Sequence, residues 1–499
     1  MQYLISIGVF LMALVSVSAK TWSDLCAFEM IPDPKGVDPQ VGALGVLPSG
    51  DLIAAFHRGE IMKYSLSQRA WSHWGGGLHE PLGMHVENEH SVVVVQRSEL
   101  TRIVDMDKDG IADVYEVIAS DWGMSGNYHE FAFGAAKAPD GSFFIGLGTA
   151  SNGGGVRPEI RGLWKVVEGL THAKTMPSWE KSGRNFPRMY ARVPYRGWVI
   201  KVDSKTGKVT PYASGLRTPH GVHVNPQGEV YVNDNQGDWL GSSKLYKIEQ
   251  GKFYGHPDSL IWTDGWDRGV PANLQAEKLD ELRTKSLCYL PQGDLANSPT
   301  QILTLPKEGF GPYGGDLIMG EMNQPRLVRY LPDVVNGVEQ GAVIGFLEHP
   351  NLGRGNAKFA LGEQGTLYIG KTQLSWAGGR GLIAFKYKDV PHLAIESVQL
   401  TSSGFKVMLN APVDETSITM TGQRYGYHYH KKYGSPKVNK TDIKASVLKV
   451  RGKVLEIVLS ESLIPGQVYD VSLAGVTSGN LGSLVDCRFF YTAHEVSGK

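Results

Sequence analysis

Five carboxylates fall within the twelve residues DMDKDGIADVYE, which run from Asp105 to Glu116. Their spacing matches an EF-hand-type calcium loop, in which the seventh residue binds through its carbonyl and a glycine makes the sharp turn. Such carboxylates repel by about 1 kcal/mol per close pair even in water, unless a cation neutralises them. The sequence therefore predicts a calcium ion, and the alternative is an acidic surface turn. The predicted ligands are Asp105, Asp107, Asp109, Ile111, Asp113 and Glu116.

The segments on either side of this loop, SELTRIV and VYEVI, are typical of β-strands. A calcium-sensing switch would need a pair of helices at these places. We therefore expect a structural clamp and no switch.

A histidine and an arginine stand at matching places, each shortly before a predicted apolar strand: His129 before FAFGAAKA and Arg217 before HGVHV. A neutral imidazole is the usual proton acceptor near pH 7, and a guanidinium stabilises negative charge that develops in a reaction. Either residue could instead be structural, the histidine bonded between neighbouring sheets and the arginine tying a loop. His85, His220 and His223 are expected to be structural.

The strands that must position these residues are parts of a sequence motif that recurs along the chain. It consists of a Pro or small residue, a Gly, an apolar stretch, Pro-x-Gly and a second apolar strand, as in PHGVHVNPQGEVYV from Pro219. Such a unit is too small to bury its apolar face alone, so copies must stack as propeller blades. Six copies can be counted, starting near Ala43, Pro81, His129, Arg217, Gly314 and Lys358.

The sequence thus predicts an all-β fold whose main domain, residues 20–390, is a six-bladed β-propeller. Loops from all blades of such a fold converge on the mouth of a central channel, where we expect His129 and Arg217 to meet. Blade three carries a long insertion, about Ser151 to Arg196, of the kind that forms binding loops or lids.

After Tyr387 the pattern changes to short alternating strands, which predict a small immunoglobulin-like β-sandwich over residues 394–496. Its run YGYHYH would place Tyr425, Tyr427 and Tyr429 on one face of a strand, opposite His428 and His430. We expect these rings to pack against the propeller, and the alternative is a carbohydrate-binding platform.

Composition and targeting limit the partners. The 50 basic and 50 acidic residues balance, so nothing indicates nucleic acid or an anionic membrane. Residues 1–19 have the apolar core and small-residue cleavage site of a signal peptide, which predicts a periplasmic or secreted protein. No other segment could span a bilayer.

The cysteines Cys26, Cys288 and Cys487 allow one disulfide at most. No haem-attachment motif is present, so any electron acceptor is expected to be a separate molecule.

The ordered series His129 to Pro139-Asp140-Gly141, then GLRTPHG, NQGDW and KFYGHP resembles the glucose/sorbosone dehydrogenase family over roughly residues 40 to 388. That family comprises six-bladed propellers, including the soluble pyrroloquinoline quinone (PQQ) glucose dehydrogenases. The nearer resemblance is to propeller–sandwich dehydrogenase-like proteins of planctomycete-type bacteria, which share NDNQGDW and YHYHxxYGSP. The resemblance implies a sugar or related alcohol as substrate, a quinone cofactor and calcium.

By this resemblance His129 would be the general base, and Arg217 would stabilise the reduced cofactor. It also implies quinone contacts from Arg217, Thr218, Asn235, Gln236 and Arg354, and a second calcium site at the Gly237 carbonyl and Asp238. The chain departs from the family where Thr218 replaces an Asn, where Glu321-Met322-Asn323 lacks a Lys, and where Arg354 stands in place of an Arg pair. Lys371, Arg380 or arginines of the insertion are the candidates to replace these cations.

Two other functions fit the same residues. One is a calcium-dependent carbohydrate hydrolase or lyase that uses His129, since one fold hosts many chemistries. The other is a non-catalytic propeller that binds carbohydrate or protein through its Tyr and Trp side chains.

Overall fold

In the computed structural model of the chain, the described residues are 20–151, 161–163, 165, 189–373, 378–414, 418–479 and 481–496. The predicted signal peptide and most of the predicted insertion lie outside these residues. Within the described ranges, no helix is long and apolar enough to cross a membrane.

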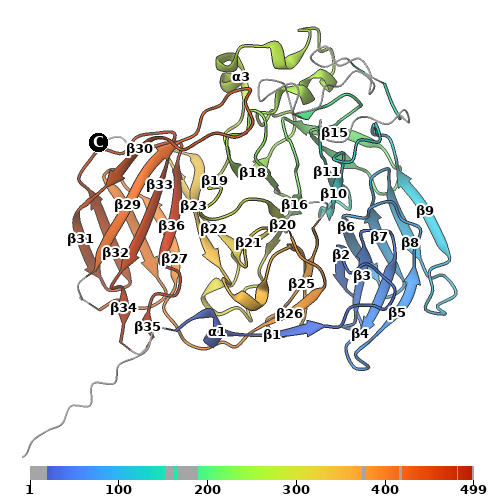
Figure 1. The fold of residues 1–499 in the computed structure, drawn as a ribbon, viewed down its shortest axis with the longest axis horizontal. Helices are drawn as coiled ribbons and strands as arrows, with labels where there is room; N and C mark the ends of the chain where they lie inside the picture. Colours follow the sequence, from blue (N-terminus) through green and yellow to red (C-terminus); the bar gives the residue numbers. More distant parts are fainter. Residues whose placement is uncertain are drawn as a thin grey trace, which may run out of the picture.

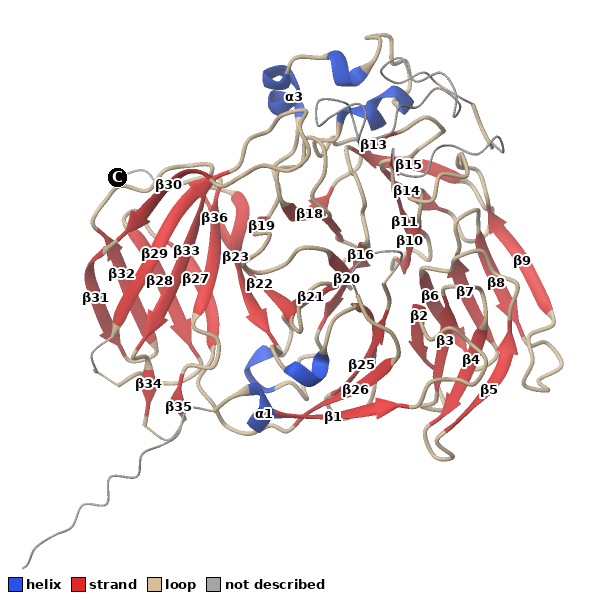
Figure 2. Ribbon diagram, in the orientation of Figure 1, coloured by secondary structure: helices blue, strands red, loops and turns tan. Residues whose placement is uncertain are grey.

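Six four-stranded antiparallel units form the propeller, and in the first five the strands follow one another along the chain (Figures 1 and 2). Blade 1 consists of β2 (Val41–Val46), β3 (Leu52–Phe56), β4 (Ile61–Ser65) and β5 (Ala70–Gly75). Blade 2 consists of β6 (Gly83–Asn88), β7 (Ser91–Val95), β8 (Leu100–Val104) and β9 (Val114–Ala119). Blade 3 consists of β10 (Ala132–Lys137), β11 (Phe143–Leu147), β14 (Trp198–Val202) and β15 (Val209–Ser214).

The second half of the ring follows the same plan. Blade 4 consists of β16 (Gly221–Val224), β17 (Val230–Asp234), β18 (Ser243–Ile248) and β19 (Cys288–Leu290). Blade 5 consists of β20 (Pro299–Thr304), β21 (Leu317–Glu321), β22 (Leu327–Val335) and β23 (Val338–Phe346). Blade 6 consists of β24 (Asn356–Leu361), β25 (Thr366–Lys371), β26 (Leu382–Tyr387) and the N-terminal β1 (Cys26–Ile31).

The innermost strands β2, β6, β10, β16, β20 and β24 contact one another in a closed circle. In blades 1, 3 and 4 the Pro-x-Gly sequence makes the turn between the first two strands, and Gly141 and Gly228 adopt φ values of 86° and 84° there, which glycine tolerates best. β1 closes the ring by pairing antiparallel with β26, from Cys26 opposite Tyr387 to Ile31 opposite Leu382. The predicted six-bladed propeller is confirmed.

One predicted blade boundary is wrong. The sequence placed the start of blade 5 near Gly314, but its inner strand is β20, which begins at Pro299. The turn from β20 to β21 is a longer segment with a short 3-10 helix, Gly311–Tyr313, in place of the Pro-x-Gly phrase. β20 therefore lacks the short turn into a second apolar strand that marks the other inner strands.

The remaining helices and short strands lie outside the blades. Helix α1 (Trp22–Leu25) precedes β1. Helix α3 (Ala276–Leu282) follows the 3-10 helices Pro257–Trp262 and Pro271–Asn273 in the connection from β18 to β19. Another 3-10 helix, Pro350–Leu352, precedes β24. Two small hairpins are β12 (Ala150–Ser151) with β13 (Met189–Tyr190), and β34 (Thr477–Ser478) with β35 (Gly482–Ser483).

The C-terminal residues form a sandwich of two four-stranded sheets. One sheet has the order β27 (Ile395–Leu400), β28 (Gly404–Leu409), β32 (Val454–Leu459), β31 (Ala445–Arg451). The other has the order β36 (Arg488–Ala493), β33 (Gln467–Ala474), β29 (Thr419–Gly426), β30 (Val438–Ile443). Named from A to G along the chain, these strand orders are A-B-E-D and G-F-C-C′.

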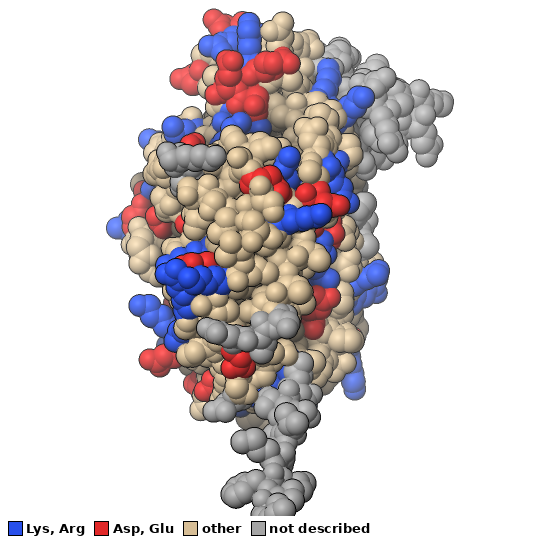
Figure 3. Space-filling view, turned by 90° about the vertical axis from the view of Figure 1, so that its left-hand side faces the viewer, with Lys and Arg blue, Asp and Glu red and all other residues tan. Residues whose placement is uncertain are grey.

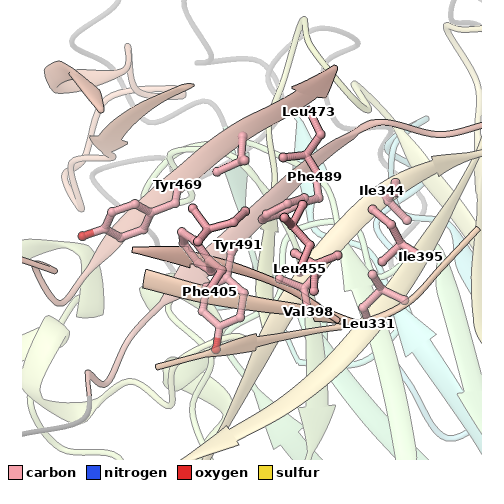
Figure 4. Close-up of a cluster of buried hydrophobic side chains, with 14 of the residues drawn as sticks. Leu331, Ile344, Ile395, Val398, Phe405, Leu455, Tyr469, Leu473, Phe489 and Tyr491 are labelled. Carbon is pink, nitrogen blue, oxygen red and sulfur yellow. The ribbon is translucent and has the colours of Figure 1, made fainter. Parts of the chain in front are cut away.

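The sandwich and the propeller share one sheet. β36 pairs antiparallel with β23, with Ala342 opposite Tyr491, so blade 5 continues into the sandwich as an eight-stranded sheet. The sandwich core accordingly includes Leu331 and Ile344 of blade 5 beside Phe405 and Phe489 (Figure 4). This continuous sheet and common core fix the orientation of the sandwich against blade 5.

The surface carries charges of both signs. On the face in Figure 3, acidic and basic side chains are interspersed, in line with the balanced composition. Cys26 and Cys288 are buried and Cys487 is exposed, and all three are free thiols.

Candidate functional site

A pocket of about 160 Å³ lies where loops of blades 3, 4 and 5 meet around the channel. Five residues predicted from the sequence line it together: His129, Arg217, Thr218, Asn235 and Gln236. The other lining residues are Tyr128, Phe131, Phe133, Ser151, His220, Gln292, Asn297, Ser298, Met322, Asn323 and Tyr433. The pocket thus combines an imidazole, a guanidinium, several amides and several aromatic rings.

The imidazole of His129 is held in one tautomer. Its Nδ1 lies 2.8 Å from the carbonyl oxygen of Thr149 and donates a hydrogen bond to it. In the neutral ring, Nε2 is then the nitrogen that can accept a proton. The Thr218 hydroxyl lies 3.5 Å from Nε2. This arrangement is suited to a general base.

Two buried arginines hold the loop that carries His129. Arg97 donates hydrogen bonds to the carbonyls of Asn127, at 2.7 Å, and Tyr128, at 2.8 Å. Arg196 donates to the carbonyls of Glu130, at 2.9 Å, and Phe131, at 3.0 Å. The backbone on both sides of the histidine is therefore fixed before any ligand binds.

A buried carboxylate fixes the loop that carries Arg217 and Thr218. Asp234, at the end of β17, accepts hydrogen bonds from the backbone N–H of Arg217 at 2.8 Å and of Thr218 at 2.6 Å. Burial raises the pKa of Asp234 to about 6, although these two N–H groups act in the opposite direction. The Nε of Arg217 is buried with no hydrogen-bond partner in the described structure, so the guanidinium can donate to a ligand.

Glu321, at the end of β21, plays the same role on the wall from blade 5. Its carboxylate accepts the backbone N–H groups of Asn297 at 2.6 Å, Ser298 at 2.9 Å, Gln324 at 2.6 Å and Asn323 at 2.5 Å. Burial raises the pKa of Glu321, and the four N–H groups lower it again in part. The segment Glu321-Met322-Asn323, where the resemblance led us to expect a Lys, thus carries a carboxylate that holds the neighbouring backbone in place.

The sandwich contributes Tyr433 to the pocket. The loop between β29 and β30 leaves the sandwich and reaches the propeller near α3 (Figure 1). Tyr429 donates a hydrogen bond to the Gly255 carbonyl at 2.6 Å and packs on Trp239, with ring centroids 5.4 Å apart. The expected packing of these rings against the propeller is confirmed, but the strand ends at Gly426 and the residues after it form a loop.

Three predicted contact residues lie elsewhere. The Gly237 carbonyl accepts the N–H of Gly434 at 3.0 Å, and Asp238 accepts the N–H of Met189 at 2.9 Å, so both hold the sandwich loop and neighbouring backbone. The side chain of Arg354 is exposed and does not line the pocket, because this residue lies in the loop before β24 and turns to solvent. None of these three residues lines the pocket, and their predicted roles as cofactor or calcium ligands stay predictions.

The acidic loop joins β8 to β9, so its flanks are strands, as predicted. Carboxylate oxygens of Asp105, Asp107 and Asp109 gather within 4.8 Å of one another. Asp105 is 1% exposed, and its Oδ1 is buried without a hydrogen-bond partner in the described structure. This donor set fits a hard divalent cation such as calcium.

The last two acidic residues of the loop are used differently. Asp113 accepts the backbone N–H groups of Met106 and Asp107, at 3.1 and 3.4 Å. Glu116 accepts a hydrogen bond from Arg102 at 2.8 Å, across the β8–β9 pair. Glu116 was predicted to be the bidentate calcium ligand. It instead lies on β9, where its side chain faces its cross-strand neighbour Arg102.

The described pocket residues do not fit PQQ. Its three carboxylates need several cations, each contributing about 1.5–3 kcal/mol as a charge-assisted contact. Arg217 is the one Lys or Arg among the described lining residues. Lys371 donates to the carbonyl of Arg354 at 3.0 Å and to Asn356 at 3.1 Å, and Arg380 lies 3.5 Å from Asp38.

Comparison with solved structures places the fold. The calcium structure of a Carbohydrate-Active Enzymes Family AA12 protein from Trichoderma reesei has a TM-score of 0.51 and 12% identity, with 73% of this chain and 96% of that chain covered. The likeness shows the six-bladed fold. The PQQ-bound aldose sugar dehydrogenase from Streptomyces coelicolor also matches, with a TM-score of 0.45, 15% identity, and coverage of 72% and 98%. No protein-family model and no curated protein match the sequence.

At this level of identity, the likeness to the Trichoderma reesei structure concerns the fold alone. Sequence reasoning missed two parts of the site. Glu321 was treated only as the position where a Lys was lacking, although a carboxylate at the end of a strand could have indicated a loop anchor. Tyr433 lies in the motif YHYHxxYGSP, but only Tyr425, Tyr427 and Tyr429 were expected to contact the propeller.

Proposed function

We propose that the protein oxidises a sugar or a related alcohol in this pocket. The observation that carries the proposal is the hydrogen bond from His129 Nδ1 to the Thr149 carbonyl, which makes Nε2 the accepting nitrogen in a pocket that Arg217 also lines. Amides and aromatic rings around these two groups suit a neutral polyhydroxy substrate.

In this proposal the alcohol loses a proton and a hydride. The O–H proton passes to Nε2 of His129, and the C–H bond breaks as the carbonyl forms, so the hydride and its electron pair pass to a separate two-electron acceptor. Arg217 stabilises negative charge on the reduced acceptor. A PQQ-type quinone is the acceptor that the fold likeness suggests, and the single cation of the described pocket argues for a less negatively charged one.

Calcium at Asp105, Asp107 and Asp109 is part of the proposal as a structural ion, supported by the buried, unpartnered oxygen of Asp105. Export is also proposed, on the signal-peptide pattern of residues 1–19.

The test is a dye-linked assay. Purified protein is incubated with aldoses and polyols and an uncharged redox dye, with and without PQQ and calcium, and carbonyl product is measured by mass spectrometry. One carbonyl formed per two electrons is expected for at least one sugar class. Dye reduction without product, or no reduction under any of these conditions, would rule out the oxidoreductase.

One observation favours a second function, a carbohydrate-binding module without turnover. Tyr128, Phe131 and Tyr433 present rings beside the amides of Gln236 and Asn323, as in many sugar sites. Sugar binding measured by calorimetry, together with no product in the assay above, would select this function.

A further inference from the structure

A second cavity, of about 190 Å³, lies inside the channel between the inner strands of the blades. An apolar cluster separates it from the first pocket: Leu82 lines the second cavity, and Phe131, Phe133 and Met322 line the first. His220 lines both. Neither the proposed reaction nor the calcium loop uses this cavity.

Lys358 of β24 projects across the channel. Its Nζ donates a hydrogen bond to the Leu82 carbonyl of blade 2 at 2.7 Å and lies 5.9 Å from the ring centroid of Phe133 in blade 3. The ammonium of Lys358 also lies close enough to His220 of blade 4 to interact with it electrostatically. A side chain from blade 6 that meets three other blades has its ammonium near the propeller axis, where it is 3% exposed.

The ammonium has no counter-charge among the described residues that line the cavity. The other titratable residues that line the cavity are Lys137, His85, His220 and His223, and its described lining contains no Asp or Glu. An ammonium carries three N–H donors, and the Leu82 carbonyl is the one acceptor that the described structure gives to Lys358. Burial lowers the pKa of Lys358 to about 7, as expected for a cation without a partner.

The histidines of the cavity are neutral donors or acceptors. Burial lowers the pKa of His223 to about 4, and its Nε2 lies 2.9 Å from the Thr304 hydroxyl. Burial and the neighbouring Lys358 lower the pKa of His220 well below its usual value. Nε2 of His220 is buried with no hydrogen-bond partner in the described structure, and His220 as a whole is 4% exposed.

We propose that this channel cavity is a binding site for a small monovalent anion, a carboxylate or a halide, held by the ammonium of Lys358 and a ring N–H of His220. A buried cation without a counter-charge is costly, and an anion beside it offsets that cost. A cavity of about 190 Å³ suits a small ion, and the absence of Asp and Glu among its described lining residues favours negative charge. The site is independent of the proposed function, because no sugar or oxidant takes part.

The site is tested by thermal unfolding and calorimetry of the full-length protein with formate and, separately, chloride at pH 6. Ionic strength is kept constant with a bulky sulfonate that the cavity cannot hold. The melting temperature of the wild type is expected to rise with one or both anions, because a ligand bound only to the folded state stabilises it. The two titrations distinguish a carboxylate ligand from a halide.

Lys358→Met removes the charge and keeps the length of the side chain, so its melting temperature should not respond to these anions. Lys137→Met is the matched control, because Lys137 is an exposed lysine of the same cavity, and it should respond like the wild type. Anion affinity should fall at least about tenfold between pH 6 and pH 9, as the ammonium loses its proton.

Crystals of the wild type soaked in bromide give a readout that does not depend on the variants. An anomalous peak within about 3.5 Å of Nζ of Lys358 is expected for a charge-assisted contact with this larger ion. A channel without such a peak, or an anion response that Lys358→Met retains, would overturn the proposal.

Discussion

The guanidinium of Arg217 in blade 4 lies over the ring of Tyr433 in the sandwich, with 5.8 Å between its central carbon and the ring centroid. Its Nη2 is 3.4 Å from the tyrosine hydroxyl. The two residues are 216 positions apart in the sequence. The C-terminal sandwich therefore completes the wall of a pocket whose other residues all belong to the propeller.

Tyr433→Ala is expected to weaken sugar binding about tenfold, which corresponds to about 1.4 kcal/mol. The variant loses a ring that covers the pocket and the cation–π partner of Arg217. Calorimetric titration measures the dissociation constant. Tyr433→Phe keeps the ring and should stay within about threefold of the wild type.

Lys432→Ala is the control for this experiment, since Lys432 is an exposed residue of the same loop. It should bind sugar like the wild type. Equal affinities for the wild type and Tyr433→Ala would mean that the sandwich loop supports the pocket without contacting the ligand.

Removal of calcium should destabilise the protein. A calcium concentration 100 times the dissociation constant stabilises the folded state by about 2.7 kcal/mol, so adding a chelator should lower the melting temperature. Asp107→Asn should remove much of this response, because it takes one charge from the three gathered carboxylates. Asp264→Asn changes an exposed carboxylate far along the chain and should leave the response intact. A chelator effect that is the same in all three proteins would contradict the calcium loop.

Asp234 should make the protein less stable as the pH rises from 4 to 6. Its folded pKa of about 6 lies above the ordinary value of 3.8, so in this range the native state binds more protons than the unfolded state. The stability contribution of this group is complete below pH 4 and lost above pH 6, a change on the order of 3 kcal/mol.

Asp234→Asn cannot titrate at this position. Denaturant unfolding should therefore show the variant gaining stability relative to the wild type between pH 4 and pH 7. A stability difference that does not change with pH would indicate that Asp234 has an ordinary pKa in the folded protein.

The blades could be predicted from sequence because each turn has a local cause. A glycine with positive φ, such as Gly141 or Gly228, marks a hairpin wherever the apolar strands on both sides are present. β20 was missed because a longer connection with a 3-10 helix joins it to β21 in place of a short turn. The pairing of β23 with β36 joins strands about 150 residues apart, and edge-to-edge pairing over that distance leaves no local pattern.

The candidate site, too, could be predicted only where a local sequence pattern marks the residues. His129 and Arg217 were found because both stand at the start of an inner strand, and the fold brings such positions to one mouth. Arg354 also precedes an inner strand, but its side chain turns to solvent, a direction that spacing does not encode. Glu116 was matched by position in a loop motif, yet its cross-strand neighbour Arg102 determines what it contacts.

The central claim is that His129 removes the hydroxyl proton of a bound sugar. Its most direct test compares the rate of sugar oxidation in the wild type and in His129→Gln, at sugar concentrations that saturate each protein. Glutamine can keep a hydrogen bond to the Thr149 carbonyl but cannot act as a base, so turnover should fall by a factor of about 10² to 10⁴. Oxidation by the variant at the wild-type rate would contradict the account.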